Sequence, residues 1–348
     1  MSNHNPILES VALGPRWPCL DPFLFCAHHD DSYPASDGKL GVQSVEFEGR
    51  DMGSDFSAKD GFSMYHGEGV PGFPGHPHRG FETVTLVRKG LIDHSDSLGA
   101  TARFGGGDVQ WLTAGKGIQH SEMFPLLNSD KPNPLELFQI WLNLPAKSKM
   151  VEPHFTMFWN EDIPRLVHSD AAGKKTTVTV IAGDLPGAAK PLAAPPESWA
   201  SQPDSDVAIW MLALEPGARW TMPRALGAQT HRMLYFYVGK SLQLSGVDLS
   251  AHAAMHVQAQ RDLELVNTGD DVVEMVLLQG RPIGEPVAQY GPFVMNTQQE
   301  IMQAMQDYRR TSFGGWPWGA NDPVHGDQHR RFARYPGAEH DEEPSLAG

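Results

Sequence analysis

Short strand-like segments recur along almost the whole chain, and this repetition limits the fold more than any other feature of the sequence. Each segment is rich in Val, Leu, Ile, Thr or aromatic residues and is bounded by Gly, Asp or Asn, as strands and their turns are. Clear examples are FETVTLVRKG, LELFQIWLNL, DVAIWMLALEPG and DVVEMVLLQG. The 35 glycines and 28 prolines are spread along the chain, which favours many tight turns. The sequence therefore predicts an all-β protein.

Helical periodicity is confined to TQQEIMQAMQDYRR, near the end of the chain. Thr297 and Glu300 have the spacing of a capping box, in which each residue satisfies a backbone N–H of the first turn. Two arginines fall in the expected last turn, and Gly314 follows as a stop. We expect one short C-terminal helix.

The two halves of the chain carry a weakly similar pattern of strand, turn and strand, in RFGGGDVQWLTAG and HVQAQRDLELVNTGDD. This similarity predicts two copies of a β-barrel unit of about 120–150 residues each. We place the first domain at residues 1–155 and the second at 156–315. Residues 316–348 are polar and acidic, and we expect an irregular tail that is partly disordered towards its end.

Charge and composition narrow the function classes. The formal net charge of −15 argues against direct binding of nucleic acid, although it leaves room for a protein partner with a basic face. No window approaches the roughly 18 apolar residues of a membrane span, and the N-terminal residues do not resemble a secretory signal. Cys19 and Cys26, the only cysteines, form no CxxC motif. We expect a cytoplasmic protein.

Two pairs of polar residues have the spacing of metal ligands. His76 and His78 are separated by one residue, and so are His120 and Glu122. Residues i and i+2 of a strand face the same way, so two such pairs on neighbouring strands can bring three imidazoles and one carboxylate together. That set suits Fe(II), Mn, Ni, Cu or Zn better than Ca or Mg, and it leaves one or two coordination positions for water, O₂ or substrate. The sequence therefore predicts a single divalent transition metal.

We do not expect the other histidine motifs to bind a metal. His94 and Asp96 precede a turn, which indicates turn hydrogen bonding and a solvated imidazole. His28 and His29 are adjacent, so on a strand they face opposite sides, and we expect local hydrogen bonds.

Several motifs together resemble the signature of the pirin family, over about residues 15–315. They are DPFLFCAHHDD, HPHRGFETVT, GDVQWLTAGKGIQHSEMF, LFQIWLNLP, KMVEPHF and GPFVMNTQQEI. Pirins are bicupins, with two β-barrels of the cupin type. The resemblance implies that the N-terminal cupin binds one metal, usually iron, through His76, His78, His120 and Glu122. Around His231 in the second half there is no H-x-H, and the later strands LELVNTG and VEMVLLQG have no H-x-E, so we expect a cupin-like domain without metal ligands.

Glu82 is the open question in this ligand set. Cupins in general take a glutamate ligand a few residues after H-x-H, where Glu82 stands, and counting by twos from His76 brings it to the same face. Pirins resemble cupins whose carboxylate comes from the second motif, which favours Glu122. Glu82 stays as an outer partner of the ligands or an alternate ligand.

The resemblance implies two kinds of function. In the first, the protein is a dioxygenase of the quercetin 2,3-dioxygenase type, with a flavonol and O₂ as substrates, Fe(II) as the expected metal and Glu122 as the residue that accepts the substrate's proton. In the second, it is a non-catalytic, redox-responsive co-regulator that binds a protein partner. An open cavity that reaches the metal would favour the enzyme, and a sealed site would favour regulation.

Overall fold

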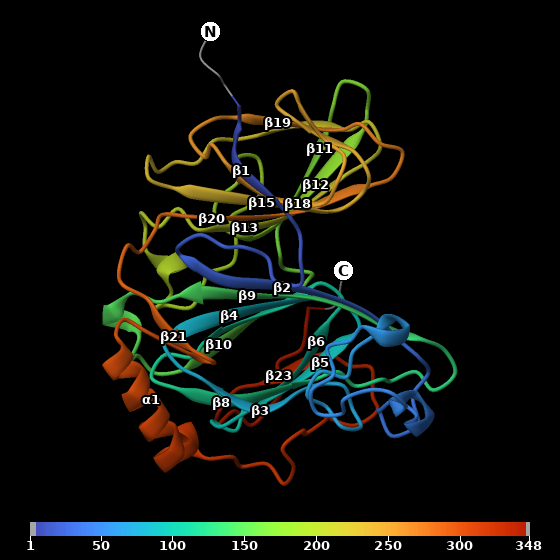
Figure 1. Ribbon diagram of the computed structural model, residues 1–348, viewed down its shortest axis with the longest axis vertical. Helices are drawn as coiled ribbons and strands as arrows, with labels where there is room; N and C mark the ends of the chain where they lie inside the picture. The colour runs from blue at the N-terminus through green and yellow to red at the C-terminus, as the bar shows by residue number, and fades with distance from the viewer. Residues whose placement is uncertain (1–4, 346–348) are drawn as a thin grey trace. The chain divides into compact units, whose positions relative to one another are not determined.

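The computed structural model describes residues 5–345, which divide into two compact units. The N-terminal barrel comprises residues 28–139, 146–161 and the chain from 285 onward, and the C-terminal barrel comprises the chain up to 27, 140–145 and 162–284. The regular secondary structure of both is mainly β-strand, as the sequence predicts (Figure 1).

The division differs from the expected boundary between residues 155 and 156, because both ends of the chain pair with distant strands. At the start, β1 (Ile7–Ala12) pairs antiparallel with β18 (Ala253–Val257) and so joins the C-terminal barrel. Near the end, β23 (Phe332–Arg334) pairs with β6 (Thr101–Gly105) of the N-terminal barrel. Neither pairing leaves a local signal in the sequence.

Two five-stranded sheets and a two-stranded ribbon form the N-terminal barrel. The first sheet has the order β10 (His154–Phe158), β7 (Asp108–Thr113), β4 (Phe81–Lys89), β9 (Asn133–Asn143), β2 (Phe23–Tyr33). The second has the order β23, β6, β5 (Leu91–Asp96), β8 (Ile118–Met123), β3 (Gly72–His78). The ribbon is β21 (Ala288–Tyr290) with β22 (Phe293–Met295). An apolar core lines the inner faces of this barrel and includes Phe104, Leu112, Leu137 and Phe155.

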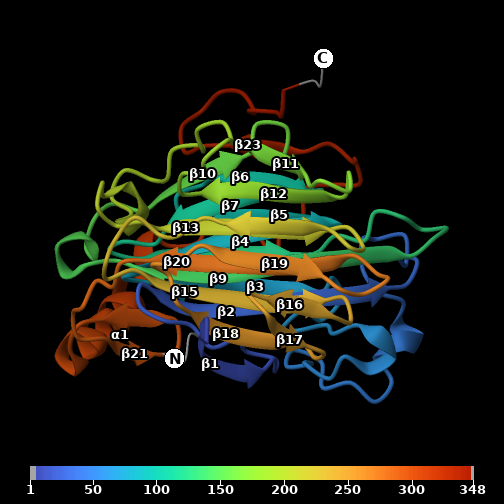
Figure 2. The same ribbon diagram turned by 90° about the horizontal axis from the view of Figure 1, so that it is seen from above.

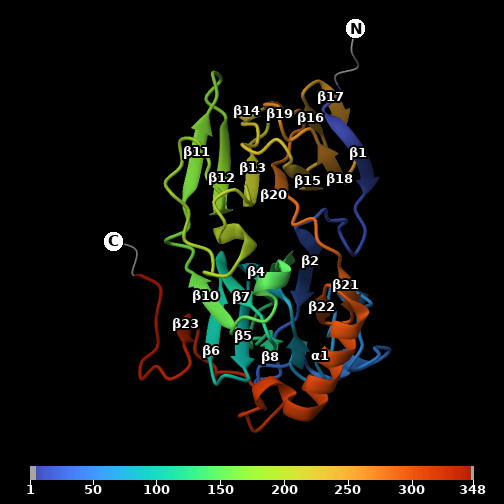
Figure 3. The ribbon, with the colours of Figure 1, turned by 90° about the vertical axis from the view of Figure 1, so that its left-hand side faces the viewer.

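A seven-stranded and a four-stranded sheet form the C-terminal barrel. Figure 2 shows the larger one in the order β1, β18, β15 (His231–Val238), β20 (Val273–Gly280), β13 (Ala208–Leu214), β12 (Lys175–Ala182), β11 (Arg165–Ser169). The smaller, visible in Figure 3, has the order β14 (Arg219–Met222), β19 (Leu263–Asn267), β16 (Leu242–Leu244), β17 (Val247–Leu249). Short 3₁₀ turns lie at Ser44–Phe47, Lys59–Gly61, Ala146–Ser148, Trp199–Ser201 and Ser312–Gly314.

Alternate residues of the larger sheet build the C-terminal core. Trp210 and Leu212 on β13 and Leu234 and Phe236 on β15 are at most 2% exposed and belong to one apolar cluster. Full burial of each such side chain stabilises the fold by about 1.5–3 kcal/mol, so the inner face of β15 is fixed by its even-numbered residues.

The expected C-terminal helix is confirmed as α1 (Gln298–Thr311). The side chain of Thr297 accepts a hydrogen bond from the backbone N–H of Glu300, and the Glu300 side chain accepts one from the backbone N–H of Thr297. Its buried side chains, Ile301 and Ala304, pack against the β21–β22 ribbon. Within residues 5–345, no helix is long and apolar enough to cross a membrane.

Apart from β23, the described part of the C-terminal tail is irregular, and a buried ion pair of the N-terminal barrel holds it in place. Arg103 and Asp93 are both fully buried, with two N–H···O contacts of 2.6 Å. The same guanidinium donates to the carbonyls of Gly326 and Gln328, and the Asp93 carboxylate accepts the backbone N–H of His325. The end of the tail, where we expect disorder, includes residues 346–348, which lie outside the described residues.

A charged cluster joins three adjacent strands of the first sheet. Glu136 on β9 is 3% exposed and accepts contacts from Arg88 (2.5 Å), Lys89 (2.8 Å) and His28 (3.2 Å). Burial opposes ionisation, but these partners outweigh it and lower the pKa of Glu136 to about 2.

This shift makes a prediction about acid stability. Because the folded pKa lies below the ordinary value of 4.5, Glu136 stabilises the fold above that pH, and its contribution is lost as pH falls towards about 2. We expect Glu136→Gln to lower the free energy of unfolding by on the order of 1–2 kcal/mol at pH 7, after allowance for solvent at the partly exposed basic partners. The variant should also lose less of its free energy of unfolding than wild type does as the pH falls from 5 to 2. Urea unfolding at several pH values measures this, with exposed Glu48→Gln as the control. Parallel pH profiles for wild type and Glu136→Gln would contradict the assignment.

Candidate metal centre

The three predicted histidines meet because of how β3 pairs with β8. In this antiparallel pair His76 lies directly opposite His120, and His78 lies two residues further on the same face of β3. One extra residue is inserted between Phe73, which pairs with Glu122, and His76. Such a β-bulge restores the side-chain alternation, so all these side chains face the interior of the barrel.

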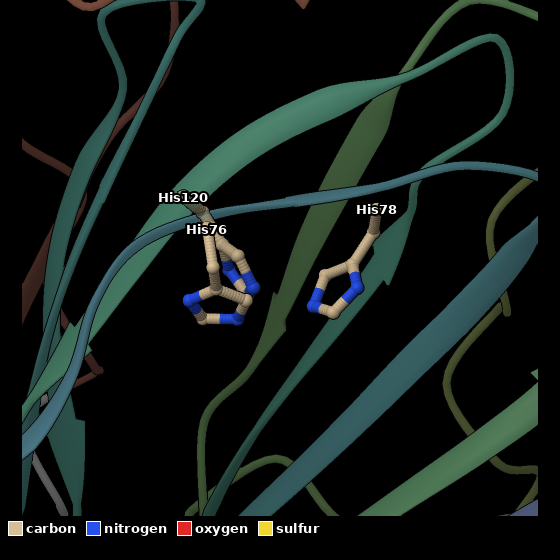
Figure 4. Close-up of side chains that lie close together, drawn as sticks. All are labelled: His76, His78 and His120. Atoms are coloured by element: carbon tan, nitrogen blue, oxygen red, sulfur yellow. The ribbon is translucent and has the colours of Figure 1, made fainter. Parts of the chain in front are cut away.

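The rings of the three histidines are packed around one point. Their centroids lie 4.8 Å (His76–His78), 4.5 Å (His76–His120) and 4.8 Å (His78–His120) apart. One nitrogen from each ring lies within 4.8 Å of the others, and Figure 4 shows these nitrogens turned towards the gap between the rings. The arrangement can accept a metal ion with three imidazole ligands.

Burial keeps these imidazoles neutral. It lowers the pKa of His76 to about 4, and it places the pKa values of His78 and His120 well below the ordinary value of 6.5. The other imidazoles of the cluster add to the effect at His78 and His120. A neutral imidazole offers the lone pair that a metal requires.

The hydrogen bonds of the histidine rings are also compatible with metal binding. Nδ1 of His76 donates to the carbonyl of Pro74 at 2.9 Å, which leaves Nε2 as the atom with a lone pair. His120 is fully buried, and neither of its ring nitrogens has a hydrogen-bond partner. A buried polar group without a partner costs about 1–3 kcal/mol, and a metal ion would remove that cost for the nitrogen that it binds.

Glu122 lies beside the three histidines but is held by other residues. Its Oε2 is 4.0 Å from Nε2 of His120 and accepts the side-chain amide of Gln139 at 3.0 Å. Its Oε1 accepts the hydroxyl of Thr85 at 3.1 Å. Burial raises the pKa of Glu122, while these two hydrogen bonds lower it in part. Sequence reasoning missed Thr85 and Gln139, because neither belongs to a ligand motif.

Glu82 faces away from the histidines, and the expected shared face is wrong. The ring of its neighbour Phe81 lies 5.1 Å from that of His78, so Glu82 points to the other side of β4, where Oε1 accepts the hydroxyl of Thr113 at 2.6 Å. Counting by twos fails because β3 ends at His78, and a turn containing Gly80 at φ +86° precedes β4.

His94 and Asp96 are also placed differently from the expectation of a solvated turn. Both are fully buried on β5, where Nε2 of His94 lies 3.3 Å from Oδ2 of Asp96. On the neighbouring strand β8, His94 pairs with Glu122 and Asp96 with His120. The spacing of two in LIDHSD, which matches that of both ligand pairs, is the signal that could have revealed this inner face.

A cavity of about 490 Å³ reaches His76. Its other lining residues are Gly53, His66, Glu68, Pro74, Gly75, Asn321 and Asp322. Its size lies within the range of about 300–1,000 Å³ found for small-molecule sites. The ring of Phe73 lies 6.3 Å from that of His76 and stacks on Tyr65 at 5.1 Å, which supplies an aromatic wall next to the cluster.

Comparison with known protein families gives two matches along the chain. The model of the family Pirin matches residues 38–142, which include all four predicted ligands. The model of the Pirin C-terminal cupin domain matches residues 209–314.

Individual proteins give the same result. A Pseudomonas aeruginosa protein named provisionally as a quercetin 2,3-dioxygenase is 38% identical over 244 residues, which cover 69% of this chain and 79% of that protein. Human pirin is 33% identical over 259 residues, covering 73% and 81% of the two chains. The crystal structure of a quercetin 2,3-dioxygenase from Acinetobacter baumannii superimposes with a TM-score of 0.66 at 25% identity, covering 89% of this chain and 98% of the other.

The histidine cluster predicts the effect of single substitutions on metal content. We expect wild-type protein, stripped by chelation and reloaded anaerobically with Fe(II), to retain about one metal per chain. His120→Ala removes a buried ligand and should weaken binding by at least about 100-fold, since even outer-shell substitutions cost 10–100-fold. Elemental analysis after desalting and a competition titration with a chelator measure both values.

Two controls accompany this experiment. His154→Ala removes an exposed histidine of the same barrel, and Glu82→Gln removes the carboxylate that faces Thr113. Both should bind the metal like wild type. Equal affinity in wild type and His120→Ala would refute the three-histidine site.

Proposed function

This chain belongs to the pirin family, and from that premise and the geometry of its candidate metal centre we propose that it is a metal-dependent dioxygenase that acts on a flavonol such as quercetin. The observation that carries the proposal is the cluster of His76, His78 and His120, three neutral imidazoles beside a carboxylate, of which His78 and His120 are buried and His76 is partly exposed. The cavity supports an enzyme over a purely regulatory protein, because a space of small-molecule size extends to His76, one of the three histidines.

The three histidines would hold one divalent ion, expected to be Fe(II), with Glu122 as an additional ligand or as its close neighbour. When bound, the ion supplies a positive charge that attracts an anionic substrate oxygen and, as iron, a redox centre for reaction with O₂. His78 and His120 are buried, so bulk water is excluded from their side of the cluster.

Glu122 is the residue that we assign to proton transfer. A flavonol must lose the proton of its 3-hydroxyl before that oxygen can bind a cation well. A carboxylate whose pKa is raised by burial is a better base than an exposed one, so Glu122 can accept this proton. Its distance of 4.0 Å from Nε2 of His120 places it beside the same point as the imidazoles.

Thr85 and Gln139 allow Glu122 to exist in both protonation states. Oγ1 of Thr85 lies 3.1 Å from Oε1 of Glu122 and 3.0 Å from Oε1 of Gln139, so its single proton can go to either. While Glu122 is ionised, Thr85 donates to it. After Glu122 takes up a proton on Oε1, it can donate to Thr85, which then donates to Gln139. The carboxyl group therefore keeps a partner throughout the proton transfer.

The proposal is tested by mixing metal-loaded protein with quercetin under anaerobic conditions and then admitting O₂. We expect O₂-dependent loss of the flavonol absorption band with consumption of O₂. Glu122→Gln should lower kcat by about 10²–10⁴-fold, the usual contribution of a general base, while Glu82→Gln should leave it unchanged. The metal content of each variant is measured in parallel, so that loss of the base is separated from loss of the ion.

The proposal fails if no O₂-dependent loss of quercetin occurs with Fe, Cu, Mn, Ni or Zn at a measured occupancy near one. Binding of a protein partner that differs between Fe(II)- and Fe(III)-loaded protein, in the absence of turnover, would favour a redox-responsive co-regulator.

A further inference from the structure

The C-terminal barrel contains a cavity of about 480 Å³ that the proposed function does not use. Three lining residues come from adjacent strands of the seven-stranded sheet: Arg232 on β15, Gln279 on β20 and Trp210 on β13. Arg232 lies directly opposite Gln279 in the pairing of β15 with β20. It also shares the inner face of β15 with Leu234 and Phe236, so its side chain points into the barrel.

The guanidinium of Arg232 is buried and only partly paired. The residue is 1% exposed, and Nε and Nη2 both donate to the same acceptor, Oε1 of Gln279, at 2.7 and 2.5 Å. Nη1 has no hydrogen-bond partner. Within residues 5–345, the side-chain hydrogen bonds of Arg232 go to Gln279, and no ion pair with a carboxylate is found. Burial lowers the pKa of Arg232 to about 10, so it is still a cation at pH 7. Burial of a cation without an anion is costly, and a bound anion would offset that cost.

The acidic residues near this cation are engaged elsewhere or lie at the rim. Asp206 accepts the backbone N–H of Gly227 at 2.9 Å, the hydroxyl of Thr230 at 2.6 Å and the amide of Gln279 at 3.2 Å. Asp184 lines the cavity but is exposed. The negative charges of Asp206 and Asp262 raise the pKa of Arg232 and so oppose the effect of burial.

The rest of the lining combines exposed cations at the rim with apolar walls. Lys190 and Arg224 are the exposed cations. The walls include Leu185, Trp210 and Leu226, and Leu226 is 90% exposed, which is unusual for a leucine. A ligand that fits has one negative charge and an apolar body, because Asp184 and Asp206 disfavour a dianion such as phosphate.

We propose that this cavity binds a small organic carboxylate, whose carboxylate group pairs with Arg232 and whose apolar body contacts Trp210, Leu185 and Leu226. Arginine is suited to this role because its planar fork can donate two parallel hydrogen bonds to a carboxylate. Nη1 is itself closed off from solvent, so the ligand reaches it when side chains at the floor of the cavity move aside.

Fluorine NMR with 4-fluorobenzoate as the probe tests this site. The full chain is used with His120→Ala in all samples, so that the probe cannot bind a metal at the histidine cluster. We expect saturable binding of 4-fluorobenzoate, little binding of neutral 4-fluorobenzamide, and at least about tenfold weaker binding in Arg232→Met. Arg219→Met, which removes an arginine of β14 that is 55% exposed and paired with Glu264, should bind like the parent protein.

Arg232→Lys keeps the positive charge but lacks the planar guanidinium group. This variant replaces Arg232→Met in the experiment if Arg232→Met does not fold. We expect it to bind several-fold more weakly than the parent. Three results overturn the proposal: no saturable binding up to about 10 mM probe, equal binding of the benzamide, or unchanged affinity in the folded Arg232 variants. Inorganic phosphate that displaces the probe at equal concentration would also overturn the assignment to carboxylates.

Discussion

The register between β3 and β8 is the constraint on which the candidate metal centre depends. It sets His76 opposite His120, and the bulge between Phe73 and His76 keeps Phe73, Glu122 and the histidines on one face of the sheet. A slip of one residue would turn these side chains to the opposite face. The positions of the three histidines and Glu122 therefore depend on the backbone hydrogen bonds between β3 and β8, which form without any ligand.

Burial then sets the properties of the groups that this register brings together. It keeps the imidazoles neutral, and it leaves His120 with two ring nitrogens that have no protein partner. The same burial raises the pKa of Glu122, while Thr85 and Gln139 hold its carboxyl group. A buried imidazole without a hydrogen-bond partner destabilises the fold, and a bound metal ion would remove this cost.

The sequence predicts that His76, His78 and His120 lie together because the spacing of their motifs matches the strand period of two. It also predicts the capping box of α1, which needs only local hydrogen bonds. Glu82 shows where the same count fails, since the turn at Gly80 separates two strands that read as one in the sequence. The pairing of β1 with β18 could not be predicted, because contacts between distant segments leave no periodic signal. The buried cation Arg232 was missed for a related reason: its burial is decided by neighbouring strands.

The most direct measurement of the central claim is X-ray absorption at the metal edge of the iron-loaded protein. Histidine rings give outer-shell scattering that oxygen ligands lack, so the number of imidazoles bound to the ion can be determined. The structure predicts three imidazoles, contributed by His76, His78 and His120, with oxygen ligands completing the shell. A spectrum that requires oxygen ligands alone would contradict this account of the metal centre.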